Sequence, residues 1–515
     1  MKSGSKPANK WLVAASVTLG TLMGTLDGTM VNIALPHIRG SLGATIQEIT
    51  WSVTGFAITN ICIMPLTGML GRRFGQKRVY MAALCVFLVS SMLCGLAPSL
   101  PALVLARALQ GMGAGALLPT EQAILRRSFP PSEQAMAMAI FSLTVMLGPA
   151  AGPTLGGLLV DTLNWRWVFF VNMPIGLLGL VLVGRFVQES EEDTTRDDAR
   201  RSVDWAGILL LLLSLMGMQM LLEGGGEWGW LEPGTVAFAL AVTFGLLAFI
   251  WRELTTPAPA VHVRLFQEPV FIRGTLLAGI LNAVLTALVF LLPLFMQEVL
   301  GFSATEAGMT LLLRVAVSAL VTPLLGRFYG VLPPQVVLAA GAFVFGVSCY
   351  QVSHFTLETS SMDIATTVAI QGIGFSAIHV TLTTLTLSRV PKHQVVDASG
   401  LHALVRQTGG SLGIAAFAAF LEHRSVMARA ALVPYVLAGR PEVVQHLQSV
   451  EANLVARGVD PGARGSAALG VLQDTIGQQA MLLAFNDSFL LISALFLVGM
   501  LPALSLRKKS HVLST

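Results

Sequence analysis

The stretch VFIRGTLLAGILNAVLTALVFLLPLFM, residues 270–296, carries a single charged side chain, Arg273. An α-helix rises about 1.5 Å per residue, so this run would form a helix about 40 Å long. The hydrocarbon core of a bilayer is about 30 Å thick and is crossed by roughly 20 apolar residues. Residues 270–296 therefore predict a membrane-spanning helix.

The composition of all 515 residues extends this prediction to the whole chain. Hydrophobic residues make up 54% and charged residues 12%, about half the charged share of soluble domains, and mean hydropathy is +0.72. So few charges cannot cover a water-soluble surface, so we expect an all-α polytopic membrane protein. The net charge of +4 is spread over many short loops, which gives no indication of a nucleic-acid partner. No CxxC pair occurs, so the cysteines predict neither a disulfide framework nor a metal site.

Apolar runs like residues 270–296 recur along the chain, and we count fourteen predicted spans. They cover residues 11–35, 50–70, 79–97, 101–125, 134–160, 166–185, 204–223, 233–252, 270–296, 306–326, 335–353, 362–388, 395–420 and 482–506.

Lysine and arginine indicate the orientation of these spans. The connections between spans lie alternately on the two sides of the membrane. Most of the 32 Lys and Arg residues fall in connections on the same side as both termini. The short connections on the opposite side contain only Arg39 and Arg166. Cytoplasmic loops carry the excess of basic residues. We therefore expect both termini to be cytoplasmic. A long outer stretch, 421–480, has helical patterning around residues 441–457.

Motifs of soluble enzymes are missing. No lysine follows a glycine, which excludes a GxxxxGK[ST] phosphate loop, and no HExxH occurs. Residues 409–413 (GGSLG) match GxSxG but lie within an apolar run, so small residues for helix contact are the better explanation. We therefore expect no enzyme activity.

Two ionisable residues lie inside predicted spans at matching depth. Asp27 is about eight residues from the outer end of the first span, and Arg107 about six residues from the outer end of the fourth. Desolvation raises the pKa of a carboxyl group, and a nearby guanidinium lowers it. A small change in hydration or in the distance to the guanidinium can therefore switch such a group between charged and neutral, as proton coupling requires. The alternatives are a static buried pair for Asp27 and a side chain that reaches the outer interface for Arg107.

Further candidates for a substrate cavity lie in other spans. Arg314 belongs to a polar stripe with a spacing of four, and His379 shares a helix face with Thr383. Structural alternatives stay open for each candidate: an interfacial acid for Glu121, a buried ion pair for Arg314, a hydrogen-bonded core histidine for His379, and core packing for the methionines. The candidates are Glu121, Arg314, His379, Arg406, Met23 and Met112.

Small residues at a spacing of four predict close helix contacts. In the fifth span glycines alternate with prolines, which remove backbone donors and bend a helix. The residues are Gly148, Pro149, Gly152, Pro153 and Gly156. Two further glycine stripes are Gly20, Gly24 and Gly28 in the first span, and Gly111 and Gly115 in the fourth.

Five segments together resemble the major facilitator superfamily, in its 14-helix drug:proton antiporter branch (EmrB/QacA type). They are LDGTMVNIALP at 26–36, the inner loop GMLGRRFGQK at 68–77 with Arg72 and Gly75, RALQG at 107–111, GPAAGPTLGG at 148–157 and NWRWVFFVNMPIG at 164–176. The chain also repeats itself in a way that fits two parallel halves, because PLTG at 65–68 returns as PLLG at 323–326.

The resemblance implies a major facilitator fold with alternating access between two six-helix bundles. Expected parts are an N-terminal bundle (1–185), a cytoplasmic linker (186–203), an inserted helix pair (204–252), a C-terminal bundle (253–506) that includes the outer stretch, and a tail (507–515). It further implies that Asp27 and Arg107 couple transport to protons, without another cofactor. The outer stretch resembles that of pumps that work with a periplasmic adaptor and an outer-membrane channel.

One departure concerns Gly71, where many superfamily members carry an acidic residue. The charge contact that this acid normally makes in the inner loop is therefore missing or made by other residues.

The sequence predicts a proton-coupled antiporter of a bacterial inner membrane that exports amphipathic small molecules in multidrug efflux. Cationic side chains exceed acidic ones in the predicted interior, which favours a second reading: export of lipids, fatty acids or other anionic amphiphiles on the same fold. A third reading is a sensor or scaffold that acts through residues 421–480 without transport.

Overall fold

The computed structural model describes residues 9–189, 204–257, 259–327, 331–391, 394–436, 441–456 and 464–505, which form an all-helical protein. Of the predicted parts, most of the linker 186–203 and the tail 507–515 lie outside the described residues. The helices of the N-terminal half are α1 (Lys10–Leu42), α2 (Ile46–Ile63), η1 (Met64–Leu66), α3 (Thr67–Phe74), α4 (Gln76–Gly95), α5 (Leu100–Ser128), η2 (Pro131–Glu133), α6 (Gln134–Thr162), α7 (Trp167–Phe170) and α8 (Asn172–Phe186).

The inserted pair and the C-terminal half follow. Their helices are α10 (Trp205–Trp228), α11 (Pro233–Thr255), η4 (Val263–Gln267), α12 (Pro269–Glu298), α13 (Ala304–Arg327), α14 (Pro334–Val352), α15 (Ser361–Leu387), α16 (Val395–Leu432), η6 (Val433–Val436), α17 (Pro441–Ala456) and α18 (Arg464–Ser505).

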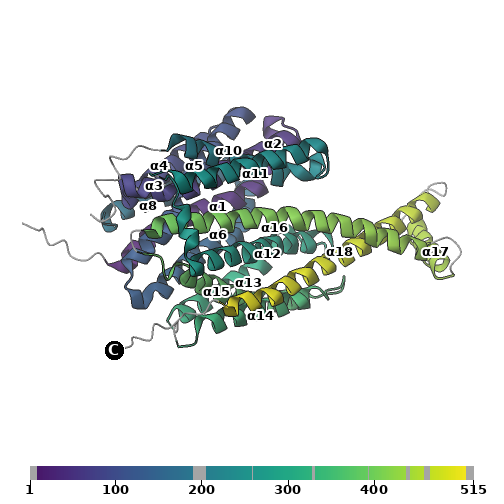
Figure 1. The fold of residues 1–515 in the computed structure, drawn as a ribbon. Coiled ribbons are helices and arrows are strands. Elements are labelled where there is room, and N and C mark those ends of the chain that lie inside the picture. The colour runs from purple at the N-terminus through teal and green to yellow at the C-terminus, as the bar shows by residue number, and fades with distance from the viewer. Residues whose placement is uncertain are drawn as a thin grey trace, which may run out of the picture.

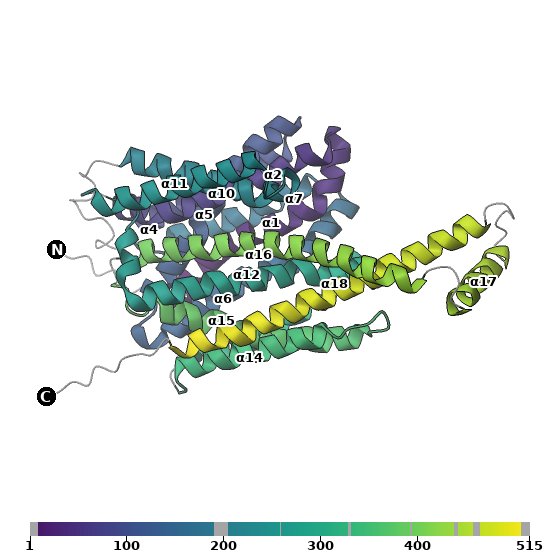
Figure 2. The same cartoon turned by 45° about the vertical axis from the view of Figure 1, so that its right-hand side comes forward.

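Within the described residues, twelve helical segments are long and apolar enough to cross a membrane. With the 33 residues of α1 and the 29 residues of α6, the fold has the fourteen spans that the apolar runs predict. Figures 1 and 2 show these helices side by side, with the start of α1 and the end of α18 at one end of the bundle and α17 beyond the other. We call these the inner end and the outer end.

The two halves repeat the same helix pairings. In the N-terminal half α1 packs on α6, α2 on α5 and α4 on α5; in the C-terminal half α12 packs on α16, α13 on α15 and α14 on α15. Contacts between the halves repeat as well, because α13 packs on α6 while η1 and α3 pack on α16. The inserted helices α10 and α11 pair with each other, and α10 lies against α2 and α16.

Glycines set the closest of these contacts. A Cβ atom at Gly148 would lie 2.5 Å from the backbone carbon of Thr25, so α6 and α1 meet backbone to backbone. Gly413 lies equally close to α12, which confirms helix contact as the role of residues 409–413. Gly111 and Gly115 bring α5 onto α2, whereas Gly28 has no atom within 4 Å of its Cβ position and sets no contact, contrary to expectation.

The helices at the outer end are longer than the apolar runs. The helix α1 continues to Leu42, and α16 continues to Leu432. The predicted outer stretch 421–480 is therefore largely helical: it holds the end of α16, the separate helix α17 and the start of α18, which project from the bundle (Figures 1 and 2). The expected helix around residues 441–457 is α17, Pro441–Ala456.

The inserted pair is fixed at the inner end by a charged N-cap. The Asp204 carboxylate accepts a hydrogen bond from the Gly207 amide at 3.0 Å and forms an ion pair with Arg252, at 2.7 Å between Oδ1 and Nη2. The hydrogen bonds from the guanidinium lower the pKa of Asp204. The contact ties the start of α10 to the end of α11.

Candidate functional site

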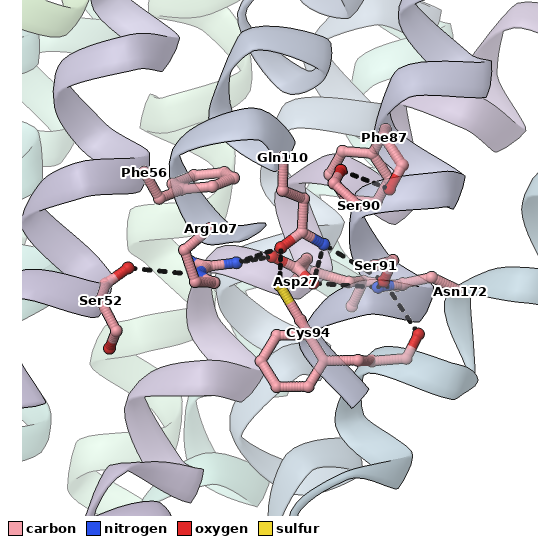
Figure 3. A network of polar contacts seen from close by, with 12 residues as sticks. Asp27, Ser52, Phe56, Phe87, Ser90, Ser91, Cys94, Arg107, Gln110 and Asn172 are labelled. Carbon is pink, nitrogen blue, oxygen red and sulfur yellow. Dashed lines mark hydrogen bonds and ion pairs between the residues drawn. The ribbon is translucent and has the colours of Figure 1, made fainter. Parts of the chain in front are cut away.

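Asp27 of α1 and Arg107 of α5 form an ion pair inside the N-terminal half. The distance from Arg107 Nη1 to Asp27 Oδ2 is 2.5 Å, and the two residues are 1% and 0% exposed (Figure 3). Asp27 and Arg107, which the sequence places at matching depth, are therefore in direct contact. Arg107 does not reach the outer interface, which removes that alternative, while the α1 carboxyl faces the protein interior.

The second carboxylate oxygen of Asp27 is held by amide donors. Gln110 Nε2 and Asn172 Nδ2 each donate to Asp27 Oδ1 at 2.9 Å, and both amides also contact Ser91 Oγ (Figure 3). Gln110 in turn accepts from Arg107 Nη1 at 2.7 Å. The carboxylate therefore joins α1 to α5 and α8, and Ser91 of α4 contacts the two amides.

Sequence reasoning did not single out Gln110, Asn172 or Ser91. Gln110 had a detectable signal, because it lies three residues after Arg107 and such residues are neighbours on a helix. Asn172 lies 145 residues from Asp27, and no local pattern relates the two.

The guanidinium of Arg107 is also enclosed on its other side. Its Nε donates to the carbonyl of Ser52 at 3.2 Å, and its Cζ lies 4.1 Å from the centre of the Phe56 ring. Both partners belong to α2. Since α2, α4, α5 and α8 each supply contacts, a shift of any of them against α1 changes the surroundings of the Asp27 carboxylate.

Glu121 of α5 is fully buried but lies apart from that pair. Its Oε1 accepts hydrogen bonds from Thr18 at 3.2 Å and from Thr144 at 3.4 Å, and its Oε2 has no partner in the structure. These partners belong to α1 and α6 of the N-terminal half. The structure thus places Glu121 in the interior, not at the membrane interface near Arg126, as one alternative had it.

Arg314 of α13 lies in the C-terminal half, where it is 6% exposed. Its Nη2 donates to Gln371 Oε1 at 2.8 Å, and its Nε has no partner in the structure. No ion pair of Arg314 is found among the described residues. The alternative of a buried ion pair is therefore not what the structure shows.

His379 and Arg406 line one cavity between α12, α15 and α16. The cavity has a volume of about 20 Å³, room for a water molecule but not for a drug-sized one. His402, four residues before Arg406 on α16, lines it too. Glu121 and Arg314 are not among its lining residues.

The two methionine predictions have different outcomes. Met23 is 0% exposed and packs in the core of the N-terminal half, the alternative considered for it. Met112 is 42% exposed, on the same face of α5 as the exposed Leu105 and Leu109. It therefore lies on the outside of the bundle, and its prediction as a cavity residue is wrong.

The inner loop contacts the other half of the protein. Arg72 of α3 forms an ion pair with the buried Asp397 of α16, and Asp397 Oδ2 lies 3.4 Å from His262 Nδ1. We call these three residues the inner-end cluster. The charge contact that Gly71 cannot make is thus made by Arg72. Gly75, at φ 89°, ends α3 in a conformation that favours glycine.

The glycines of the fifth predicted span lie on the face of α6 that meets α1. Gly148, Gly152 and Gly156 approach Thr25, Thr29 and Met30 respectively. The side chains of Pro149 and Pro153 lie outside what the structure describes, and the backbone is helical through both.

Comparisons with known proteins agree on the architecture. A family model described as "Major Facilitator Superfamily" matches residues 17–414. Among solved structures, the proton:xylose symporter XylE superposes with a TM-score of 0.62 at 13% identity, over 96% of this chain and 94% of that one. The human organic anion transporter MFSD10 superposes with a TM-score of 0.60 at 14% identity, over 95% and 99%.

Bacterial relatives match at higher identity. The multidrug export protein EmrB of Haemophilus influenzae is 34% identical over 78% of each chain. The fatty acid resistance protein FarB of Neisseria gonorrhoeae is 30% identical over 96% of each chain. The multidrug export protein EmrB of Escherichia coli is 30% identical over 95% of this chain and 93% of its own.

Proposed function

Since the chain belongs to the Major Facilitator Superfamily, in its 14-helix drug:proton antiporter branch, we propose that it exports amphipathic small molecules in exchange for protons. It is a multi-pass membrane protein and not an enzyme. We place it in a bacterial inner membrane with both termini cytoplasmic. The multidrug export activity named for its EmrB relatives supports this cargo.

The observation that carries the proposal is the buried Asp27–Arg107 pair. A charged carboxylate in this dry site depends on the guanidinium and the two amides that contact it. If α1 moves against α5 within the N-terminal half during the transport cycle, these contacts weaken and the carboxyl binds a proton; when they return, the proton leaves. One charge crossing a potential of 100 mV supplies about 2.3 kcal/mol, enough for a cargo gradient of roughly fortyfold.

The change Asp27→Asn tests this proposal. It keeps the shape of the side chain but replaces one of the two acceptor oxygens by an NH2 group and removes the carboxyl group that binds the proton. We expect inverted vesicles with this variant to show no more substrate-driven loss of the pH gradient than vesicles without the protein. Asp161→Asn, at an exposed aspartate of α6, is the control and should transport normally. Full proton-coupled efflux by Asp27→Asn would overturn the proposal.

A second candidate function is the export of fatty acids or other anionic amphiphiles on the same fold. Two observations favour it: Arg314 is a buried cation that pairs with no acid in the described residues, and the FarB relative is named for fatty acid resistance. An unpaired charge inside a membrane is costly and usually functional. In this reading Arg314 attracts anionic cargo toward the C-terminal half.

We also propose a periplasmic adaptor and an outer-membrane channel as partners. The projection formed by the end of α16, η6, α17 and the start of α18 supports this proposal, because it extends beyond the membrane-spanning bundle (Figure 2). It also exposes large apolar side chains to solvent, among them Val426, Met427 and Tyr435. Exposed apolar groups of this kind are typical of protein contacts.

A further inference from the structure

We propose that the cavity between α12, α15 and α16 binds the carboxylate head group of an amphiphile. The inference rests on the proposed export function and names the cargo class of the C-terminal half. It goes beyond the general case for anionic cargo, because it identifies the residues that bind the head group, and its test separates a carboxylate from a phosphate.

Helical spacing gathers the polar groups of this cavity. His402 and Arg406 lie four residues apart on α16, and His379 and Thr383 lie four residues apart on α15, so each pair shares a helix face. Asn282 of α12 closes the third side. All five groups therefore converge on one small space.

The positive charge that Arg406 brings to this space is paired with no acidic residue among those that the structure describes. None of the ten lining residues is acidic. Arg406 is partly buried, and an ionisable side chain within a membrane-spanning helix is costly and usually functional. A bound anion would supply the missing negative charge and offset this cost. The charge of the cavity therefore favours an anionic ligand.

Neighbouring contacts hold the polar groups in place and leave atoms available for a ligand. The His379 ring stacks on Phe375 at 4.2 Å between ring centres, and its buried Nδ1 has no hydrogen-bond partner among the described residues. His402 Nδ1 lies 3.4 Å from the Thr275 hydroxyl. Asn282 donates to the backbone carbonyl of Arg406 at 2.9 Å, which fixes the α16 backbone beside the cavity.

The remaining lining determines what kind of anion fits. Apolar side chains of α12 and α15 make up half of the wall: Ala278, Leu281, Leu285, Ile378 and Leu382. An apolar wall beside a guanidinium suits an anionic head on a hydrocarbon tail. A guanidinium binds both carboxylates and phosphates through two parallel hydrogen bonds. The cavity of about 20 Å³ admits only a small head group, and the carboxylate is the smaller of the two anions.

The cavity also lies at the boundary between the two halves. The Arg406 Cζ is 5.8 Å from the centre of the Phe141 ring, which belongs to α6 of the N-terminal half. When the halves separate, this side of the cavity opens. A carboxylate that binds Arg406 can therefore enter and leave from the space between the halves.

Equilibrium binding to the purified full chain tests this inference without a proton gradient. The probes are four compounds with the same twelve-carbon tail: dodecanoate, dodecyl phosphate, dodecylamine and dodecanol. We expect dodecanoate to bind more tightly than the other three. Arg406→Gln should weaken dodecanoate binding by about tenfold or more, as expected for the loss of a charged hydrogen bond, and leave dodecylamine binding unchanged. Arg429→Gln, at an exposed arginine of the same helix, should bind like the wild type.

Several outcomes would overturn the inference. Equal affinity for dodecanol would show that only the tail is bound, tighter binding of dodecyl phosphate would assign the site to phosphate, and unchanged dodecanoate affinity in Arg406→Gln would exclude the guanidinium. If Arg406→Gln does not fold, Arg406→Lys replaces it: this variant keeps the charge but loses the paired hydrogen bonds, so dodecanoate affinity should fall between the wild type and dodecanol-like binding.

The inference and the proposed function can fail separately. Asp27→Asn removes proton coupling but leaves the cavity intact, so it should bind dodecanoate like the wild type. A protein that binds dodecanoate but exports nothing would disprove the function alone. A protein that exports cationic dyes in exchange for protons but does not distinguish dodecanoate from dodecanol would disprove this inference alone.

Discussion

Asp27 depends on donors from two other helices, and each donor is itself buried. Arg107 and Gln110 come from α5 and Asn172 from the first position of α8. Each hydrogen bond fixes one lone pair of the carboxylate, and none can be replaced by water at a site that is 0% exposed. The precision of the site therefore comes from how several helices meet, with Asn172 as the most distant contributor in sequence.

Replacing Asn172 by leucine should destabilise the protein. The change removes the donor to Asp27 Oδ1 and to Ser91 Oγ, and a buried polar group without its partner costs about 1–3 kcal/mol. We expect a lower unfolding temperature in thermal denaturation of the purified protein. Asn32→Leu is the control, because Asn32 is exposed on α1. Equal unfolding temperatures for the two variants would contradict the assigned role.

Sequence reasoning found part of this site and could not find the rest. Asp27 and Arg107 were found because a charge inside an apolar run is rare and its depth can be counted along a helix. The partnership with Asn172 depends on how α8 packs against α1 and α4, which no local pattern encodes. Met112 was misplaced because Gly111 and Gly113 pack against α2 and α4 on either side of it, which leaves the face between them on the outside.

At the scale of helices, the contact between α1 and α6 tolerates no added atom. The glycines of α6 lie at intervals of four residues, and the first, Gly148, meets the backbone of Thr25. Backbone atoms cannot move aside as a flexible side chain can. The glycine stripe of α6 was predictable from spacing, whereas the partner helix and the tightness of each position required the structure.

Gly148→Ala should therefore disrupt this contact. The added methyl group would lie 2.5 Å from the backbone carbon of Thr25, and overpacking of this kind costs about 1–3 kcal/mol. Gly157→Ala on the same helix meets no atom within 4 Å, so it should be neutral or slightly stabilising, because alanine favours helix more than glycine does. Thermal unfolding of both variants checks the difference. Equal losses of stability would show that helix propensity, and not the contact with α1, governs this helix.

Helix ends were the least predictable feature at this scale. The apolar run of the thirteenth span ends near residue 420, but α16 continues to Leu432. Apolarity ends where the membrane ends, whereas hydrogen bonding along a helix continues as long as no residue interrupts it. The pattern of apolar runs therefore located the membrane-spanning parts but not the helical projection beyond them.

For the whole molecule, the inner-end cluster joins the two halves. Arg72 belongs to the N-terminal half, Asp397 to the C-terminal half, and His262 to the segment that follows the inserted pair. Around them, η1 and α3 pack so closely on α16 that a Cβ atom at Gly400 would lie 2.6 Å from the carbonyl of Met64. The inner end of the structure is thus closed, and alternating access requires these contacts to break.

Asp397→Asn should make the inner end open more often. The change removes the carboxylate that pairs with Arg72 across the two halves. Breaking a buried ion pair costs about 3–5 kcal/mol, and only the closed state loses this stabilisation. Thr67, which is 0% exposed and lies beside Gly400, can report opening as Thr67→Cys in a chain whose four native cysteines are replaced by serine. We expect a membrane-impermeant maleimide, added to inverted vesicles, to label Thr67→Cys faster when Asp397→Asn is present.

The control for this experiment is Asp363→Asn, which removes an exposed carboxylate at the start of α15 and should not change the labelling rate. Exchanging the two charges, with Arg72→Asp and Asp397→Arg together, should slow labelling relative to Asp397→Asn, because a pair of opposite charges again spans the two halves. A labelling rate that stays at the wild-type value in Asp397→Asn would mean that apolar packing of η1 and α3 on α16 closes the inner end without help from the ion pair.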